Sequence, residues 1–357
     1  MKLLFYISTI RGGGAARVLT NLANQFVKDE NNVMLVTNFP SEHEYFLEER
    51  VVRVSLEKEE SKQNPLVKNW NRIFALRKVI KEYDPDLVVS FMHENDIRAF
   101  MATRGLGKKL LLSVRNDPKE LYRSRVKEII ARYVYGHADA VVFQTEDAKR
   151  WFKTLKGKST IIYNQVAPEF YQAKRVRFGA KDIVTTGKFM PQKNHRMLME
   201  AFAMIADEIS DNLIIYGEGK LRGEYEAYIR EHCLESRVFL PGNCSNVAAT
   251  IAKSKIFVMS SDYEGMPNSL MEAMAVGLPC ISTDCPCGGP KELSGDINSV
   301  ELVPVGDTKE LAKKMKHMLL QASYREEKAC LAKKSAERFQ PELIFAQWKA
   351  YILEIIG

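Results

Sequence analysis

The sequence KIFVMSSDYEGMPNSLMEAMAVGLPC, residues 255–280, decides how the fold is interpreted. Its apolar start, Lys255–Ser260, predicts a buried parallel strand. A polar turn follows, and Leu270–Ala275 then predicts a helix that ends near Gly277 and Pro279. A strand, a loop of small residues and a helix, in that order, are the repeating unit of α/β proteins with a parallel sheet.

The loop between this strand and this helix is also a candidate binding site. Backbone amides at the start of a helix, together with its positive end, attract an anion. Two carboxylates, Glu264 and Glu272, bracket the loop. A bound phosphate would repel a carboxylate, so we expect both to accept hydrogen bonds from hydroxyl groups. A ligand with phosphate and hydroxyl groups together suggests a sugar nucleotide.

Strand and helix patterns alternate along the whole chain in two series. The first series covers residues 1–163, and the second starts after an aperiodic stretch, 164–177, that is interpreted as a linker. We therefore predict an α/β protein with two doubly wound, Rossmann-like domains that face each other across a cleft, at 1–163 and 164–340. The amphipathic segment Pro341–Gly357 predicts a helix that finishes the second domain or crosses back to the first.

Length and composition exclude several classes of protein. The 357 residues, 46% of them hydrophobic, are enough for two domains with their own cores. No apolar run approaches the ~18–20 residues of a membrane span, and Lys2–Ser8 is interpreted as a first strand rather than a signal peptide. The six cysteines show no paired CxxC spacing, which favours reduced thiols over a metal site. We therefore expect a cytoplasmic protein.

The formal charge of +7 lies entirely in the first half of the chain. Residues 1–163 carry 28 Lys and Arg against 20 Asp and Glu, whereas residues 164–357 carry 24 against 25. This excess suits an anionic membrane surface or a phosphorylated acceptor, and a merely solvated surface stays open as the alternative. The predicted helix Tyr122–Tyr135, with several basic residues, has the same two interpretations. Nucleic acid is not expected, because no recognition motif accompanies the charge.

A second cluster of candidate residues follows the strand predicted at Asp182–Thr186. Lys188 and Lys193 flank a turn there, and two ammonium groups could neutralise a diphosphate. Glycine lets a ring approach the backbone, so two further loops could line a base or sugar pocket through Gly217, Gly242 and Asn243. No Ser–His–acid order, zinc spacing or P-loop is present. The chemistry is therefore expected to rest on binding geometry and electrostatics.

The first domain has candidate residues after two of its predicted strands. Gly13 and Gly14 belong to a glycine run that permits close approach of a ligand, or simply makes a tight turn. Arg17 stands where the last glycine of GxGxxG would fall, so the signal for NAD is weak. Arg115 and Asn116 follow the strand Leu110–Val114 and are expected to face the cleft.

With these residues in view, the chain resembles the family 4 glycosyltransferases, retaining enzymes of the GT-B fold, over essentially its whole length. Glu264–Glu272 matches the E-x7-E signature, and Gly187–Lys193 matches the G-(R/K)-x-x-x-x-K turn of that family. Arg17 fits its G-G-x-x-R loop. The resemblance also implies that the helix at 341–357 packs back on the N-terminal, acceptor-binding domain.

The resemblance implies a role for each residue of the donor site. Glu264 would contact hydroxyls of the transferred sugar, and Glu272 would bind the ribose hydroxyls. The diphosphate would be held by Lys188, Lys193 and the loop Gly265, Met266, Pro267, Asn268, Ser269 and Leu270, with its amides around 268–270 closest. These groups would stabilise the leaving diphosphate without a metal or another cofactor. The acceptor hydroxyl would then attack from the face that the diphosphate leaves.

The resemblance also implies the substrates. The EGMPN form and Asp284–Pro290 look like bacterial enzymes of surface-polysaccharide pathways, which mostly use UDP-sugars. Such enzymes commonly extend glycans linked to undecaprenyl diphosphate, at the inner face of the membrane. The chain departs from the family at Lys188, where an arginine is usual, and at Asn116, near the position of a usual histidine.

Two rival interpretations remain at this point. A sugar-nucleotide epimerase is built on the same two-domain fold, and it would produce a new sugar nucleotide without an acceptor. A non-catalytic protein that binds polyanions or lipid surfaces would also be basic. The presence of both glutamates and both lysines argues against that second alternative.

Overall fold

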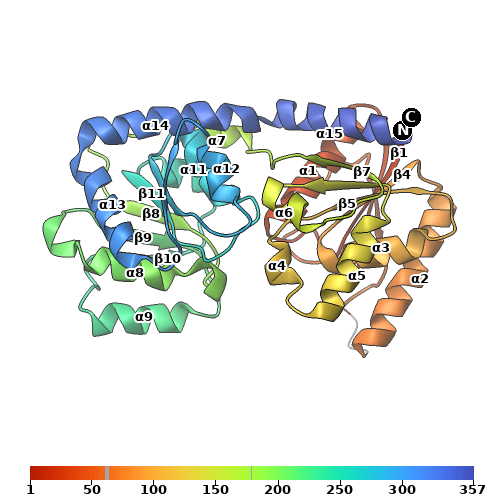
Figure 1. Cartoon of the computed structure of the whole chain (residues 1–357), viewed down its shortest axis with the longest axis horizontal. Coiled ribbons are helices and arrows are strands. Elements are labelled where there is room, and N and C mark those ends of the chain that lie inside the picture. The colour runs from red at the N-terminus through yellow and green to blue at the C-terminus, as the bar shows by residue number, and fades with distance from the viewer. Residues whose placement is uncertain (61–63, 178) are drawn as a thin grey trace. The chain divides into compact units, whose positions relative to one another are not determined.

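The structure is a computed structural model that describes residues 1–60, 64–177 and 179–357. Its contacts group the chain into two compact units. The first comprises Met1–Asn164 and Ile344–Gly357, and the second comprises Gln165–Leu343. Each unit has a parallel sheet covered by helices (Figure 1). This is the α/β architecture that the strand–helix alternation predicts.

The first unit is built on seven parallel strands in the order β3-β2-β1-β4-β5-β6-β7. The order reverses between β1 and β4, and ligands of open α/β sheets bind beyond the carboxyl ends of strands at such a point. The strands are β1 (Lys2–Ile7), β2 (Asn32–Thr37), β3 (Val52–Ser55), β4 (Leu87–Phe91), β5 (Lys109–Ser113), β6 (Ala140–Phe143) and β7 (Lys158–Ile161).

The helices of this unit are α1 (Gly14–Lys28), α2 (Pro65–Tyr83), α3 (His93–Thr103), α4 (Pro118–Leu121), α5 (Arg125–Gly136) and α6 (Glu146–Trp151). The sequence predicts one helix over Tyr122–Tyr135, but the chain instead begins α5 at Arg125. Ser124 explains the later start, because its Oγ accepts a hydrogen bond from the Lys127 amide at 3.3 Å and caps the helix.

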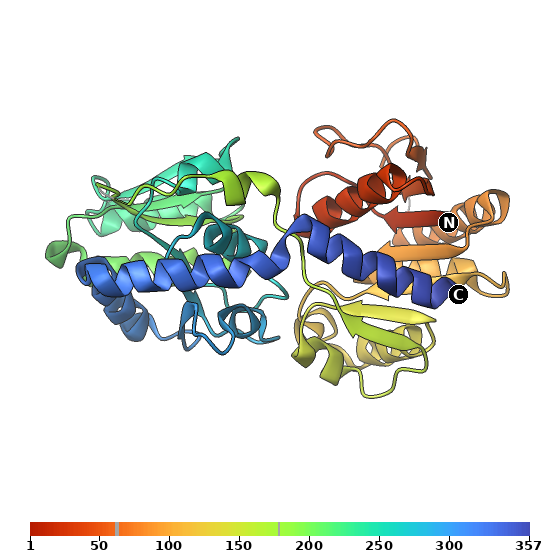
Figure 2. The same cartoon turned by 90° about the horizontal axis from the view of Figure 1, so that it is seen from above.

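The last helix, α15 (Pro341–Ile356), contributes to the core of the first unit from Ile344 onward. Trp348 is fully buried, and its ring lies 5.7 Å from that of Phe91 on β4. Lys109 donates to the carbonyl of Ile356 at 3.0 Å, so a cation meets the negative end of the helix. Figure 2 shows this blue helix running beside α1 and the first strands.

The second unit has six parallel strands in the order β10-β9-β8-β11-β12-β13. They are β8 (Ile183–Thr186), β9 (Leu213–Tyr216), β10 (Val238–Gly242), β11 (Ile256–Met259), β12 (Cys280–Thr283) and β13 (Val300–Val303). Its helices are α7 (Pro168–Gln172), α8 (His195–Ala203), α9 (Arg222–Glu231), α10 (Val247–Ile251), α11 (Asn268–Val276), α12 (Gly289–Ser294), α13 (Thr308–Leu320) and α14 (Ala322–Ala336). The stretch expected to be a plain linker thus contains α7.

The strand–loop–helix unit predicted at 255–280 is confirmed as β11 and α11. Gly277 ends α11 with φ +86°, a left-handed conformation that glycine adopts without strain. The order of the sheet reverses between β8 and β11, which are neighbours. The loops that follow these two strands therefore meet at one edge of the sheet, where a ligand is expected to bind.

Candidate active site

Side-chain hydrogen bonds join the loop after β8 to the loop after β11. Lys193 Nζ lies 2.6 Å from Glu264 Oε1. Asn194 Nδ2 donates to Asp262 Oδ1 at 2.7 Å, and Gln192 Nε2 donates to the Tyr263 carbonyl at 2.8 Å. Two candidates that lie 71 positions apart in the sequence are thus in direct contact.

The carboxylate of Glu264 is almost fully buried but well compensated. The residue is 8% exposed, and the same Oε1 that meets Lys193 also accepts from Ser261 Oγ at 2.8 Å. A buried carboxylate needs such partners because removal from water is costly. The Lys193 side chain remains 20% exposed, so solvent and ligands still reach its ammonium group.

Lys188 differs from Lys193 in its environment. It follows β8 by two residues and is exposed. Within the described ranges, it forms no ion pair with an acidic side chain. A cation in this position can turn toward an anion without first breaking an internal contact.

The first turn of α11 provides backbone amides that no side chain caps. Pro267 is the N-cap residue and has no side-chain acceptor, and the first turn contains no acidic residue. The amide of Met271 donates to the Pro267 carbonyl at 3.2 Å, so the amides of Ser269 and Leu270 precede the intrahelical ladder. The positive end of α11 therefore faces the loop, and its own first turn contributes no acidic side chain to compensate it.

Glu272 lies on the second turn of α11, eight positions after Glu264. It is 7% exposed, and Met266 and Leu270 are buried beside it in the chain. Both glutamates of the E-x7-E pair are thus held in fixed surroundings, one at the end of a strand loop and one on a helix. Figure 1 shows α11 beside β11 in the second unit.

Close backbone approaches explain several glycines around this site. A Cβ on Gly289 would lie 1.9 Å from the Gly265 carbonyl oxygen, so the start of α12 supports the loop. A Cβ on Gly217 would lie 1.9 Å from the Gly187 carbonyl oxygen, and one on Gly242 would lie 2.9 Å from Glu218 Oε1. The sequence assigned Gly217 and Gly242 to a base or sugar pocket. The structure gives Gly217 a packing reason, whereas Gly242 has φ +87°, a backbone conformation that favours glycine, and the atom near it is the end of a flexible side chain. Asn243 follows Gly242 and is exposed.

Sequence reasoning missed two titratable neighbours of the Lys193–Glu264 pair. Burial, and then the charge of Lys193, lower the pKa of His195 to about 4, so its ring is neutral near pH 7. Burial, and then the charge of Glu264, raise the pKa of the Cys285 thiol to about 12. Neither group supplies a charge or a thiolate nucleophile at neutral pH. His195 lies two positions after Lys193 in the chain, whereas the position of Cys285 next to Glu264 depends on the fold and has no signal in the sequence.

The candidates of the first unit lie beyond the carboxyl ends of neighbouring strands. Gly13, with φ +91°, is the N-cap residue of α1, and Gly14 is its first residue. The amide of Arg17 donates to the Gly13 carbonyl at 3.2 Å. Arg115 and Asn116 follow β5, two strands away from β1 in the same sheet. The fold thus brings both groups to one edge of this sheet.

Arg115 directs its guanidinium into the unit rather than out of it. The group lies 3.8 Å from the centre of the Phe91 ring, and Nη1 donates to Asn164 Oδ1 at 2.8 Å. Burial lowers the pKa of Arg115 to about 9. The Arg115 guanidinium thus packs on Phe91 near this edge of the sheet, and Arg115 and Asn116 are both partly exposed there.

The described residues lack two features, one that would hold a metal ion and one that would span a membrane. No group of three or more His, Cys, Asp or Glu side chains is arranged to hold a metal ion within the part of the chain that the structure describes. Across those same residues, no helix is both long enough and apolar enough to pass through a membrane.

Comparisons with known protein families match both units. Residues 12–170 match the model described as "Glycosyltransferase Family 4", and residues 180–321 match the model described as "Glycosyl transferases group 1". The first match runs from the loop before α1 into α7, and the second runs from just before β8 to the end of α13. The GT-B assignment is confirmed by these matches and by the two parallel sheets.

Two relatives from Campylobacter jejuni align over nearly the whole chain. One is an α-1,4-N-acetylgalactosaminyltransferase acting on a GalNAc-GalNAc-diNAcBac-PP-undecaprenol glycan, 28% identical over 99% of both chains. The other is an N-acetylgalactosamine-N,N'-diacetylbacillosaminyl-diphospho-undecaprenol 4-α-N-acetylgalactosaminyltransferase, also 28% identical over 99% of both chains. Among solved structures, Anabaena HepE in complex with UDP has a TM-score of 0.83 at 19% identity over 99% of this chain and 100% of that one.

Proposed function

The chain belongs to the family 4 glycosyltransferases, and we propose that it is a retaining, metal-independent enzyme that uses a UDP-sugar. Its acceptor is a hydroxyl group of a glycan linked to a polyprenyl diphosphate, in the synthesis of a surface polysaccharide or related glycan. The contact between Lys193 and Glu264, next to the uncapped start of α11, carries this proposal.

The donor diphosphate binds where positive groups converge. Lys188 and the amides of Ser269 and Leu270 contact phosphate oxygens, and Lys193 turns from Glu264 toward the diphosphate. In the reaction the bond between the sugar C1 and the phosphate oxygen breaks, and a bond between C1 and the acceptor oxygen forms. The acceptor proton passes to the leaving phosphate oxygen. The cations and the helix end stabilise the charge that develops on the diphosphate.

The two glutamates recognise different parts of the donor. Glu264, in contact with Lys193, lies next to the diphosphate position and accepts hydrogen bonds from hydroxyls of the transferred sugar. Glu272, on the second turn of α11, accepts hydrogen bonds from the ribose hydroxyls. Carboxylates form strong hydrogen bonds with hydroxyl groups, which fixes the sugar and the nucleoside separately.

The proposed substrates rest on the relatives. The structure of HepE was determined with UDP, which supports a uridine nucleotide. Both Campylobacter relatives act on glycans attached to undecaprenol through a diphosphate, which supports a lipid-linked acceptor.

A panel of UDP- and GDP-sugars tests the proposed reaction. We expect UDP-sugars to raise the unfolding temperature more than GDP-sugars, and one UDP-sugar to be hydrolysed slowly without acceptor, with EDTA present. Formation of a new sugar nucleotide would identify an epimerase instead. No stabilisation by any nucleotide would support a non-catalytic protein.

The first unit has an apolar helix face that suits a membrane surface. Val126, Ile129, Ile130 and Tyr133 on α5 are 42–67% exposed, and their spacing places them on one face. Arg125 and the neighbouring basic residues Arg123 and Lys127 flank this face. Exposed apolar residues bordered by cations bind anionic lipid interfaces. We therefore propose that α5 docks on the membrane that holds the acceptor.

Replacement of Val126 and Ile129 by serine tests this docking. Each substitution removes apolar area that contributes about 1 kcal/mol to binding at the lipid interface. The affinity for phosphatidylglycerol vesicles should therefore fall at least about fivefold. Cosedimentation with vesicles measures the effect. Leu320→Ser, at a 54% exposed leucine of α13, is the matched control and should bind as the wild type does. Equal sedimentation of all three proteins would exclude α5 as the docking face.

A further inference from the structure

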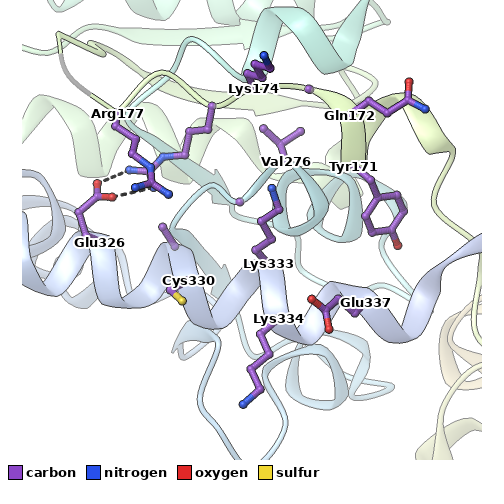
Figure 3. A pocket seen from close by; sticks show the side chains of 14 residues that line it. Tyr171, Gln172, Lys174, Arg177, Val276, Glu326, Cys330, Lys333, Lys334 and Glu337 are labelled. Carbon is purple, nitrogen blue, oxygen red and sulfur yellow. Dashed lines mark hydrogen bonds and ion pairs between the residues drawn. The ribbon is translucent and has the colours of Figure 1, made fainter.

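The second unit contains a groove of about 850 Å³ that the donor site does not use (Figure 3). The segment 171–177, which begins at the end of α7, forms one side, and α14 forms the other. Val276 and Gly277, at the end of α11, form the floor. All three elements belong to the same unit.

The groove lies at the sheet edge opposite to the donor loops. The donor loops precede α11, whereas Gly277 ends this helix just before β12 begins at Cys280. A helix of nine residues is roughly 13 Å long. A ligand in the groove is therefore separated from the donor pocket by the length of α11.

The lining of the groove is rich in basic side chains, although the second unit as a whole has almost no net charge. Residues 165–343 contain 23 Lys and Arg against 24 Asp and Glu. The groove, by contrast, is lined by five basic side chains and two acidic ones: Lys174, Arg175, Arg177, Lys333, Lys334, Glu326 and Glu337. The excess is local and marks this surface as attractive to anions.

The basic residues of the groove differ in whether an acidic side chain of the described chain neutralises them. Arg175 donates two hydrogen bonds to Glu326, while its Nε is buried without an acceptor. Lys333 packs its stem on Gly277 and extends toward Val276 (Figure 3). In the described parts of the chain, neither Lys333 nor Arg177 forms an ion pair with an acidic side chain. These two cations are available to a ligand.

We propose that this groove binds an anion that carries phosphoryl groups, at a site separate from the donor pocket. Several cations around one groove match a ligand with more than one negative charge and several acceptor oxygens. Arg177 supplies a planar fork that suits phosphate oxygens, and Lys333 supplies a point charge. Glu326 neutralises Arg175 and holds it, so the ligand contacts the cations that remain unpaired.

The test uses inorganic pyrophosphate and the full chain. UDP is kept at a saturating concentration so that the donor pocket is occupied, and pyrophosphate is titrated by calorimetry. We expect the wild type to bind pyrophosphate and the double variant Arg177→Gln, Lys333→Gln to bind it at least tenfold more weakly. Lys309→Gln removes one charge from an exposed lysine of α13 that is not part of the groove and should leave the affinity unchanged.

Vesicles separate the two sources of a phosphoryl group. If lipid headgroups occupy the groove, the double variant also sediments less with phosphatidylglycerol vesicles than the wild type. If soluble phosphates occupy it, sedimentation is unchanged while pyrophosphate affinity falls. Equal affinity of the wild type and the double variant for both probes overturns the proposal. If UDP fails to bind, only the assignment of the donor pocket is refuted. The comparison of pyrophosphate affinity between the wild type and the double variant does not need bound UDP.

Discussion

Replacing Glu272 by alanine is expected to weaken UDP binding by about 10- to 100-fold, because hydrogen bonds to a charged group contribute about 1.5–3 kcal/mol. The carboxylate is 7% exposed on α11, where the helix holds it in place for the ribose hydroxyls. Calorimetric titration with UDP measures the loss. The same variant should show a similar loss with UDP-sugars, since the ribose is common to them.

Two control variants distinguish the loss of the carboxylate from a general loss of folded structure. Glu231→Ala removes an exposed carboxylate at the end of α9 and should bind UDP as the wild type does. Glu272→Gln keeps the shape of the side chain and should retain an intermediate affinity. If Glu272→Ala binds UDP like Glu231→Ala, the ribose assignment is wrong.

Replacing Glu264 by glutamine should lower the rate of transfer and leave UDP binding almost unchanged, unlike the replacement of Glu272. Transfer is expected to fall by about 10²- to 10³-fold, the usual cost of removing one group that acts at the reacting centre. UDP affinity should stay within about threefold of the wild type or rise slightly, because loss of the carboxylate releases Lys193 for the diphosphate. Initial rates of UDP release and calorimetry measure the two quantities.

Lys193→Gln provides the matched comparison for Glu264→Gln. Both variants break the 2.6 Å contact, so a purely structural role of the ion pair would make them behave alike. The proposed roles instead predict that Lys193→Gln weakens UDP binding and Glu264→Gln does not. If the two variants bind UDP with equal affinity, the ion pair only stabilises the contact between the two loops.

The sequence predicted most of what depends on local pattern. The strand, loop and helix at 255–280 follow from an apolar run, a small-residue turn and a glycine stop, and all three are present. Clustering of the loops after β8 and β11 follows from a parallel sheet. The direct contact of Lys193 with Glu264 could not be predicted, because it requires β8 and β11 to be neighbours, and strand order is a long-range property.

Side-chain direction and local capping are two features that the sequence pattern does not determine. Arg115 follows a strand and is predicted to face the cleft, and in the structure its guanidinium lies over the Phe91 ring and donates to Asn164. The helix predicted at Tyr122–Tyr135 begins later because Ser124 competes for backbone amides. The groove beside α14 was not foreseen, since its charges come from two segments that are almost 150 positions or more apart in the sequence.

The central claim is that the two glutamates of one donor site have different functions. Titration of UDP into Glu272→Ala and Glu264→Gln, side by side under the same conditions, tests it most directly. We expect a loss of affinity of about 10- to 100-fold in the first variant and wild-type or slightly tighter binding in the second. Indistinguishable titrations of the two variants would contradict it.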